Sequence, residues 1–314
     1  MTATRLDVLV STETLARIGP DPHPRVRLWT EPGSGCSAVW RRQSDRTAWL
    51  LGVVDSLPGV EWVHTDTAGV DRLPLAEWTR RGITLTNARG AYSEAMGEWV
   101  LGAVLAVSKG MPALVRQSDA AQWGPTVQSR RVAGSTVAIL GLGSIGTQVA
   151  RLCSALSMRT VGVVRSSSPE RSGADLVLGA EDDWRSVLPD ADFLVVTLPL
   201  TDDTRGLVDG AVLARLQRGA WLVNVGRGRV VDQGALLNAL DSGELGGAVL
   251  DAVDPEPLPA SSDLWCRPNV IVTPHVSAAS IDAQQRAFGV FIDEARRRVV
   301  GVSPRNAFNI MKGY

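Results

Sequence analysis

Short hydrophobic runs alternate along the chain with longer stretches in which hydrophobic positions recur every three or four residues. The first pattern is typical of buried strands and the second of helices that cover a sheet. Their alternation through most of the chain predicts an α/β fold with mainly parallel, doubly wound sheets. In the N-terminal part the predicted strands are Leu6–Val10, Trp49–Val54, Trp62–His64 and Ile83–Thr86.

A second series of strands begins at Thr136 and has helical patterns or turns between its members. Such a series is long enough to build a whole doubly wound domain. The predicted strands are Thr136–Leu140, Thr160–Val164, Phe193–Thr197, Trp221–Val225, Ala248–Asp251 and Val270–Thr273.

Two helices frame this second series. The first begins at Ser93, a good N-cap residue, and its apolar positions cover more than one side, so we expect it to be buried between domains or subunits. The last helix ends near Gly301. Its apolar face is predicted to comprise Ile281, Phe288, Phe291, Ile292, Ala295 and Val299.

Length and composition narrow the class of protein. At about 150 residues per domain, 314 residues predict about two domains, and 45% hydrophobic with 21% charged residues excludes a disordered or fibrous chain. A net charge of -1 argues against a nucleic-acid binder. The apolar run Trp99–Val107 is far shorter than the roughly 20 residues of a membrane helix. Cys36, Cys153 and Cys266 lack metal-type spacing. We expect a soluble, cytoplasmic protein that binds neither metal nor membrane, with its cysteines packed as small apolar residues.

A glycine pattern follows the predicted strand Thr136–Leu140. Gly141, Gly143 and Gly146 match G-x-G-x-x-G, and a helical pattern follows. In that context the glycines allow a tight turn and a close approach of the backbone to a pyrophosphate at a helix N-terminus. We therefore predict a dinucleotide site that includes Ser144 and Ile145. The alternative is a glycine turn inside an ordinary α/β unit.

The end of the next strand predicts the kind of dinucleotide. An acidic residue usually holds the ribose 2′-hydroxyl of NAD at this point. Here Val164 is followed by Arg165 and Ser166, which suit the 2′-phosphate of NADP through charge-assisted hydrogen bonds. We therefore expect NADP(H) to be preferred, with NAD(H) possible. The alternative is a solvated loop whose arginine has no ligand.

Three residues with catalytic chemistry follow predicted strands of the second series. Arg227, Glu256 and His275 each come just after a predicted strand, and strands of an open α/β sheet present their carboxyl ends to the ligand crevice. Singly, they could be a salt-bridging arginine, part of a rigid proline-rich loop and a turn histidine. His23 lies in a proline-rich turn, and His64 could be a core residue or lie near the crevice.

These blocks, in order, resemble the D-isomer-specific 2-hydroxyacid dehydrogenase family over nearly the whole chain. Within it the chain is most similar to the NADPH-dependent glyoxylate/hydroxypyruvate reductases. The resemblance implies that Arg227, Glu256 and His275 are catalytic and that a loop at Ala68 and Gly69 binds the substrate carboxylate. Further cofactor contacts implied by the resemblance are Leu198, Pro199, Thr204, Val225 and Asp251.

The resemblance also implies an arrangement of domains. It predicts two Rossmann-like domains, with a dinucleotide-binding domain at 97–279 inserted into a substrate domain made of 1–96 and 280–314. Family members commonly form homodimers through the nucleotide domain and the long linking helix. Trp123 either packs in the core or reaches the active site of a partner subunit.

The chemistry implied is the reduction of a small 2-oxoacid to a D-2-hydroxyacid. A histidine can protonate the carbonyl oxygen as hydride arrives, and a carboxylate beside it fixes its orientation and favours its charged form. An arginine can hold the substrate carboxylate and polarise the carbonyl. Glyoxylate or hydroxypyruvate is the first expectation for the substrate. The alternatives are a phosphoglycerate or formate dehydrogenase of the same fold, or a non-catalytic dinucleotide-sensing protein.

Overall fold

A computed structural model describes residues 5–18, 23–33, 35–42, 44–67, 69–70, 73–125, 127–165 and 173–309. The chain divides into two compact units, unit 1 from 1–92 with 281–314 and unit 2 from 93–280. Unit 2 begins at Ser93 rather than at 97 because helix α4 (Ser93–Ser108) is continuous across the predicted boundary. The binding roles assigned to the two parts stay predictions.

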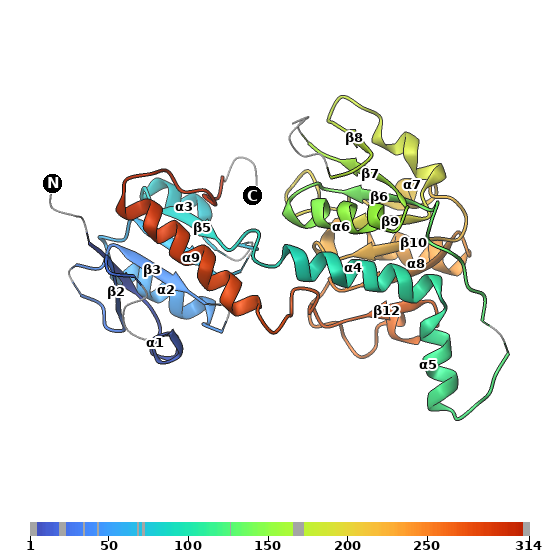
Figure 1. The fold of residues 1–314 in the computed structure, drawn as a ribbon, viewed down its shortest axis with the longest axis horizontal. Helices are drawn as coiled ribbons and strands as arrows, with labels where there is room; N and C mark the ends of the chain where they lie inside the picture. Colours follow the sequence, from blue (N-terminus) through green and yellow to red (C-terminus); the bar gives the residue numbers. More distant parts are fainter. Residues whose placement is uncertain are drawn as a thin grey trace. The chain divides into compact units, whose positions relative to one another are not determined.

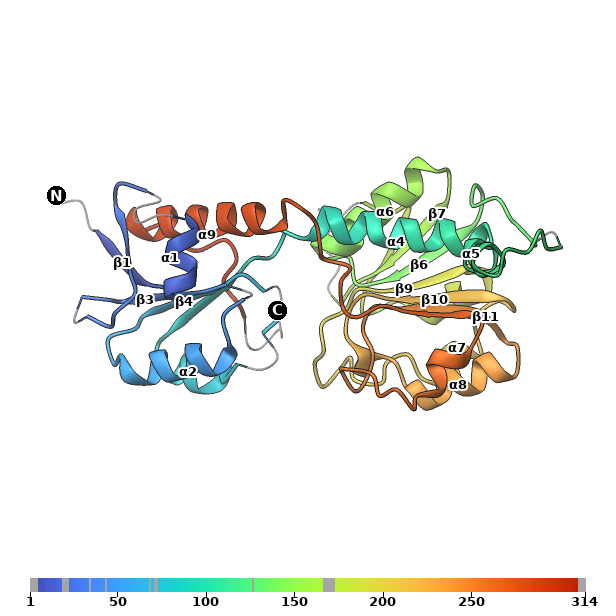
Figure 2. The same cartoon turned by 90° about the horizontal axis from the view of Figure 1, so that it is seen from below.

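Unit 1 is a parallel sheet covered by helices on both faces. Its strands have the order β2-β1-β3-β4-β5, a doubly wound order. The strands β1 to β5 are Leu6–Leu9, Val26–Trp29, Ala38–Arg41, Trp62–Thr65 and Thr84–Asn87. The helices α1, α2, α3 and α9 are Thr12–Ile18, Thr47–Ser56, Leu75–Arg80 and Ala283–Val299. Figure 2 shows α1 and α9 on one face of this sheet and α2 on the other.

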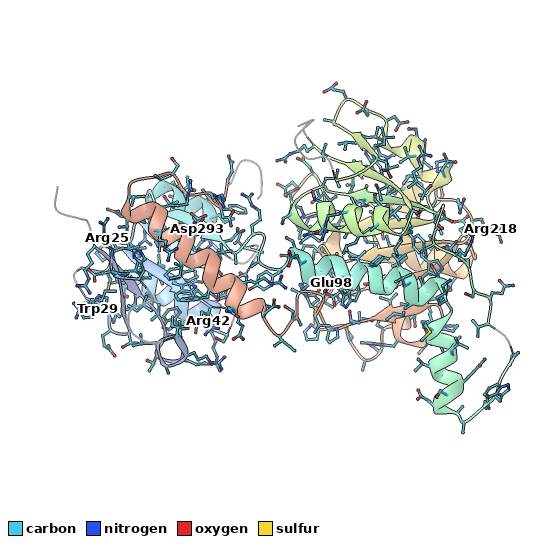
Figure 3. The ribbon with its side chains drawn as sticks, in the orientation of Figure 1. Arg25, Trp29, Arg42, Glu98, Arg218 and Asp293 are labelled. Atoms are coloured by element: carbon cyan, nitrogen blue, oxygen red, sulfur yellow. The ribbon has the colours of Figure 1, made fainter. Side chains whose placement is uncertain are left out.

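The C-terminal helix α9 completes the core of unit 1. Phe291 stacks on Trp40 with ring centroids 3.8 Å apart and also lies against Trp62. The buried Arg42, labelled in Figure 3, donates a hydrogen bond to Gln284 near the start of α9. Ile281 was predicted on the apolar face of this helix, and that prediction is wrong: the helix starts at Ala283 and Ile281 is fully exposed.

The predicted strand Trp49–Val54 is also wrong. These residues belong to α2, where Leu50 and Val54 lie one turn apart and are both buried. A short apolar run has no period of its own, so it fits a strand or a buried helix equally well. The structure also has strands β2 and β3, which the sequence pattern did not predict.

Unit 2 is a parallel sheet with strand order β12-β11-β10-β9-β6-β7-β8 (Figure 1). Its strands β6 to β12 are Thr136–Leu140, Arg159–Val163, Leu176–Leu178, Phe193–Val196, Ala220–Asn224, Leu245–Leu250 and Val270–Val272. Its α-helices α4 to α8 are Ser93–Ser108, Met111–Asp119, Ser144–Ala155, Gly210–Leu213 and Gln233–Asp241. The 3-10 helices η1 to η3 are Trp184–Asp190, Gly228–Val230 and Asp263–Cys266. Each of the six strands predicted for this part is present, and the short strand β8 at the edge of the sheet is additional.

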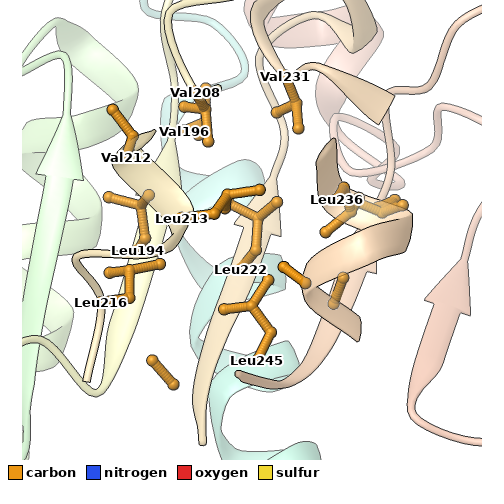
Figure 4. Close-up of a cluster of buried hydrophobic side chains, with 14 of the residues drawn as sticks. Leu194, Val196, Val208, Val212, Leu213, Leu216, Leu222, Val231, Leu236 and Leu245 are labelled. Carbon is orange, nitrogen blue, oxygen red and sulfur yellow. The ribbon is translucent and has the colours of Figure 1, made fainter. Parts of the chain in front are cut away.

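One hydrophobic core cluster of unit 2 lies on the face of its sheet that α7 and α8 cover. Leu194 and Leu222 from the strands meet Leu213 and Leu236 from these helices, and all four are buried (Figure 4). Across the other face, α4 packs closely on α6: a Cβ on Gly97 would lie 3.0 Å from the Cβ of Gln148. The sheet is therefore fixed on both faces, and the loops at its carboxyl edge are attached to a rigid base.

Among the described residues, no single helix has the length and hydrophobicity needed to cross a membrane. Helices α4 and α5 satisfy that criterion only when taken together, and they are bent by 71°.

Candidate active site

Arg227, Glu256 and His275 lie at one edge of the sheet of unit 2. They follow β10, β11 and β12, which are adjacent and parallel, so their loops leave from the same carboxyl edge. The structure therefore brings together, on neighbouring loops, three residues that are far apart in the sequence.

His275 and Glu256 are in direct contact. The Nδ1 atom of His275 lies 3.0 Å from Oε2 and 3.2 Å from Oε1 of Glu256. Glu256 also accepts a hydrogen bond from the backbone N–H of Val253 at 3.2 Å, which fixes the carboxylate. The side chain of His275 is 44% exposed. A carboxylate on Nδ1 directs the other ring nitrogen, Nε2, away from the pair, and from there it can exchange a proton with a ligand.

Asp251 organises the backbone around His275. His275 has a left-handed backbone with φ of 56°, which is uncommon for a residue other than glycine. Asp251 is buried, and its carboxylate accepts hydrogen bonds from Val276 N–H and Ser277 N–H at 2.8 Å and from Thr273 Oγ1 at 2.5 Å. Asp251 was predicted as a cofactor contact, but its carboxylate faces the histidine loop. Its contact with a cofactor stays a prediction.

The loop that carries Arg227 is attached to the loop that carries Glu256. The buried amide of Asn224 donates to the carbonyls of Arg227 and Ala252, both at 3.1 Å. At Gly228 a Cβ would lie 2.0 Å from the carbonyl oxygen of Val253, so the two loops touch through their backbones. Sequence reasoning assigned no role to Asn224. A polar residue at the end of an apolar strand was the available signal.

The glycine turn after β6 fits a dinucleotide. Gly141 has φ of 99°, and a Cβ on Gly146 would lie 1.9 Å from the carbonyl oxygen of Gly141. These two glycines are therefore required by the turn itself. Gly143 and Ser144 are exposed at the N-terminus of α6, and a Cβ on Gly143 would meet no atom within 4 Å. An open, exposed helix N-terminus with accessible backbone N–H groups suits a pyrophosphate. Ile145 lies in the first turn of the same helix.

Arg165 follows β7, where the 2′-phosphate of NADP was predicted. Its Nη1 atom lies 3.8 Å from Oδ2 of Asp203, and the two side chains are 45% and 79% exposed. Ser166 lies outside the described residues. No motif in the sequence marks Asp203, because nothing in the pattern links two loops so far apart in the chain.

The remaining predicted cofactor contacts follow β9 and β10. The side chain of Leu198 lies against Gly141, and Val225 is buried at the end of β10. Thr204 donates its hydroxyl to the carbonyl of Pro199 at 2.7 Å, which closes the loop after β9. Of these residues, Leu198 borders the glycine turn. The contacts of these residues with a cofactor stay predictions.

In the predicted carboxylate-binding loop of unit 1, Ala68 lies outside the described residues. Gly69 is described, and its carbonyl accepts a hydrogen bond from the hydroxyl of Thr67 at 2.9 Å.

The other candidates for chemistry have ordinary structural settings. His64 is fully buried, and burial lowers its pKa to about 3, so it is a core residue. The Nδ1 atom of His23 accepts a hydrogen bond from Arg25 N–H at 3.2 Å. Cys36 and Cys153 are buried as expected, but Cys266 is exposed, so the prediction that it packs as an apolar residue is wrong. Within the described ranges, no group of three or more His, Cys, Asp or Glu side chains is placed to hold a metal ion.

Comparison with known families decides the affiliation of the chain. Residues 101–277 match the NAD binding domain of the D-isomer specific 2-hydroxyacid dehydrogenases. The chain belongs to this family. The fold predicted from the sequence is therefore confirmed, as is the assignment to an oxidoreductase family that uses a nicotinamide dinucleotide.

Individual relatives agree with this affiliation. A glyoxylate reductase of Thermofilum pendens is 29% identical over 268 residues, which cover 83% of this chain and 75% of that protein. Two solved structures are each 28% identical and cover 99% of this chain and 100% of their own. One is a D-isomer specific 2-hydroxyacid dehydrogenase of Xanthobacter autotrophicus Py2 in complex with NADPH and MES, with a TM-score of 0.82. The other is an NADPH-dependent glyoxylate/hydroxypyruvate reductase of Sinorhizobium meliloti in complex with NADP and sulfate, with a TM-score of 0.80.

Proposed function

We propose that this D-2-hydroxyacid dehydrogenase reduces a small 2-oxoacid, such as glyoxylate or hydroxypyruvate, with NADPH. The observation that carries the proposal is the His275–Glu256 pair, 3.0 Å apart, which joins the loops after β12 and β11 beside the loop of Arg227. The reduction of a 2-oxoacid requires a proton donor for the carbonyl oxygen and a cation that binds the carboxylate. His275 and the guanidinium of Arg227 can supply these two groups. When bound, the nicotinamide supplies the hydride that adds to the carbonyl carbon.

His275 is the proposed proton donor. As the carbonyl carbon accepts the hydride, the C=O π electrons move to oxygen, and the imidazolium gives that oxygen its proton from Nε2. The substrate leaves as the hydroxyacid, and the imidazole is neutral until it takes a proton from water. Glu256 holds the ring through Nδ1 and stabilises the imidazolium, because a carboxylate lies 3.0 Å from the charged ring.

Arg227 is the proposed carboxylate and carbonyl ligand. Its Nη1 donates to the carbonyl of Gly226 at 2.8 Å, and Asn224 holds its backbone. A guanidinium fixed in this way can present two parallel donors to a substrate carboxylate. The backbone N–H groups of Ala68 and Gly69 are assigned to the other carboxylate oxygen on the family resemblance alone.

NADPH is the proposed cofactor because Arg165 is a cation at the end of β7. Arg165→Ala should weaken binding of NADPH while leaving that of NADH nearly unchanged, since only NADPH carries the 2′-phosphate. Titration of both cofactors checks this preference. Equal affinities for the two in the unaltered enzyme would contradict it.

The test of the activity is a panel of 2-oxoacids, assayed at 340 nm with NADPH and with NADH in parallel. The panel includes 3-phosphohydroxypyruvate for the phosphoglycerate dehydrogenase alternative. We expect the smallest 2-oxoacids to be reduced fastest, and His275→Asn to lower kcat by about 10²- to 10⁴-fold. Retention of most of kcat in His275→Asn would refute the assigned mechanism.

A homodimer is part of the proposal. Helix α5, which stands away from the sheet of unit 2 in Figure 1, exposes Met111, Leu114 and Val115, and Trp123 beyond it is fully exposed. Core packing of Trp123, one of its two predicted roles, is therefore wrong for this chain. Apolar side chains gathered in this way suit a contact with a second copy. Light scattering during gel filtration should give twice the mass of the chain, and Val115→Asp should reduce it to one.

A further inference from the structure

Arg165 and Asp203 lie on opposite sides of the strand that carries the glycine turn. Arg165 follows β7 and Asp203 follows β9, and β6 lies between these two strands in the sheet. Neighbouring strands are about 4.8 Å apart, so β7 and β9 are roughly 10 Å apart where their loops begin. The 3.8 Å separation of the two charged groups therefore means that the pair spans the carboxyl end of β6.

The glycine turn is anchored to both of the flanking strands. The N–H of Gly141 donates to the carbonyl of Val163 at 2.9 Å, two residues before Arg165. The hydroxyl of Thr197 donates to the carbonyl of Gly141 at 2.7 Å, on the side of Asp203. The Arg165–Asp203 pair is thus held next to the proposed dinucleotide site.

The loop that carries Asp203 has a fixed shape. Thr204 donates its hydroxyl to the carbonyl of Pro199 and accepts a hydrogen bond from Thr201 N–H at 2.8 Å. The N–H of Gly206 donates to the carbonyl of Arg229 at 2.8 Å, which ties the loop to the segment after β10. The structure of the loop therefore keeps the carboxylate of Asp203 close to Arg165.

We propose that Asp203 sets the balance between NADPH and NADH by competing with the 2′-phosphate for Arg165. This inference rests on the proposed cofactor site. The guanidinium can face the carboxylate of Asp203 or the phosphate, and the phosphate also carries negative charge close to that carboxylate. NADH has a hydroxyl at this point and leaves the pair intact. Asp203 therefore weakens binding of NADPH selectively and moderates the preference that Arg165 creates.

The test compares Asp203→Asn with Asp202→Asn. Asp202 is the neighbouring exposed carboxylate, for which the described part of the chain shows no ion pair, and its loss removes the same formal charge. Dissociation constants are measured for NADPH and NADH, and for the fragments 2′,5′-ADP and 5′-AMP. Asp203→Asn should tighten binding of NADPH and 2′,5′-ADP by about 1.5- to fivefold, the range of an exposed ion pair, and leave that of NADH and 5′-AMP unchanged. Asp202→Asn should change none of these constants.

Two further measurements test whether Asp203 acts by competing with the 2′-phosphate for Arg165 or only by its negative charge near the cofactor. Because exposed charges are screened by salt, the gain in Asp203→Asn should shrink between 50 mM and 500 mM NaCl. In an Arg165→Gln background, Asp203→Asn should increase the affinity for NADPH by a smaller factor than in the unaltered enzyme. The arginine for which the Asp203 carboxylate and the 2′-phosphate compete is then absent.

Two results would overturn the inference, and they are distinguishable. If Arg165→Gln weakens NADPH but Asp203→Asn leaves the NADPH/NADH ratio unchanged, the cofactor site stands and the competition is wrong. If Arg165→Gln leaves that ratio unchanged as well, the proposed 2′-phosphate site itself is wrong.

Discussion

The carboxylate of Asp251 holds the chain on both sides of His275, through the Thr273 hydroxyl before it and two backbone N–H groups after it. Its hydrogen bonds to Thr273, Val276 and Ser277 surround a residue whose φ of 56° is unfavourable for a side chain with a Cβ. A backbone of this kind persists where neighbouring groups hold it in place. We infer that Asp251 is a positioning residue that directs the imidazole towards Glu256.

Asp251→Asn should therefore act on catalysis rather than on cofactor affinity. The amide nitrogen cannot accept a hydrogen bond, so one N–H of the histidine loop loses its partner and the ring loses its fixed orientation. We expect kcat to fall on the order of 10- to 100-fold, with the dissociation constant of NADPH changed by less than about twofold. Steady-state kinetics and a fluorescence titration of NADPH measure the two effects separately.

Two variants of Thr273 provide the matched comparison. Thr273→Ser keeps the hydroxyl that donates to Asp251 and should retain most of kcat, whereas Thr273→Val removes it and should lower kcat. Loss of NADPH affinity in Asp251→Asn, with kcat at saturating cofactor retained, would instead support the cofactor contact that the family resemblance implies.

At the residue scale, the sequence predicted the functional residues that follow strands. It did not predict the residues that position these functional residues by hydrogen bonds or ion pairs. Arg227 and His275 could be placed at the carboxyl edge of the sheet for two reasons. The ends of the strands can be predicted from the sequence, and parallel strands share that edge. Two interactions depend on where the loops bend. They are the hydrogen bonds that Asp251 accepts from the 273–277 segment and the ion pair of Asp203 with Arg165. Those bends depend on tertiary packing, for which the sequence has no local signal.

The turn between β6 and α6 offers a second prediction, at the scale of the element. Gly146→Ala would place a Cβ 1.9 Å from the carbonyl oxygen of Gly141, a clash that only movement of the backbone relieves. We expect this variant to lower the melting temperature of unit 2 by several degrees. Thermal unfolding followed by circular dichroism measures the change.

Gly143→Ala is the matched control. Its Cβ would meet no atom within 4 Å, and its φ of -73° is open to alanine. This variant should keep the melting temperature but weaken NADPH binding, because the methyl group would project into the space proposed for the pyrophosphate. If Gly143→Ala bound NADPH normally, the pyrophosphate would have to lie elsewhere.

The buried side chain of His64 in strand β4 makes the free energy of unfolding depend on pH. Burial lowers the pKa of His64 from 6.5 to about 3, so between these values the unfolded chain takes up a proton that the folded chain does not. The free energy of unfolding therefore falls as the pH falls below about 6.5. Burial of Asp66 raises its pKa from 3.8 to about 6, and its contribution has the opposite sign, with stability lost as the pH rises through that window.

His64→Asn isolates the histidine contribution. We expect the wild type to lose more stability than the variant between pH 7 and pH 5, by up to about 1.4 kcal/mol per pH unit below 6.5. Urea unfolding of both proteins at several pH values measures the difference, and the titration of Asp66 cancels between them. Parallel pH profiles would show that His64 does not contribute this term.

The elements themselves were predicted unequally in the two units. In unit 2, β6 was predicted with its observed bounds, because a long apolar strand is followed at once by a glycine turn and a helix. In unit 1 the run Trp49–Val54 was assigned to a strand although it lies in α2. Tertiary packing decides such cases: Leu50 and Val54 lie on one side of either a helix or a strand, and here they pack as part of α2 against Val39 and Val63 of the sheet.

Among the described residues, each of the two units has hydrophobic core clusters of its own. One cluster of unit 1 contains Trp40, Trp62 and Phe291, and Phe291 comes from α9 near the C-terminus. The described cluster of unit 2 between its sheet and helices α7 and α8 contains no residue of α9. Unit 1 thus depends on a distant segment of the chain, whereas unit 2 is continuous from 93 to 280.

This division predicts that the two units can be destabilised and stabilised independently. Phe291→Ala removes the ring that stacks on Trp40 and should cost unit 1 about 3–5 kcal/mol, with little effect on unit 2. NADPH at about 100 times its dissociation constant should add about 2.7 kcal/mol to unit 2, where the glycine turn lies, with a smaller effect on unit 1. Hydrogen exchange followed by mass spectrometry resolves the two, with peptides from β4 reporting on unit 1 and peptides from β9 on unit 2. If Phe291→Ala and NADPH each changed exchange equally in both units, the units would unfold as one, because a single cooperative transition transmits any local change in free energy to every protected amide.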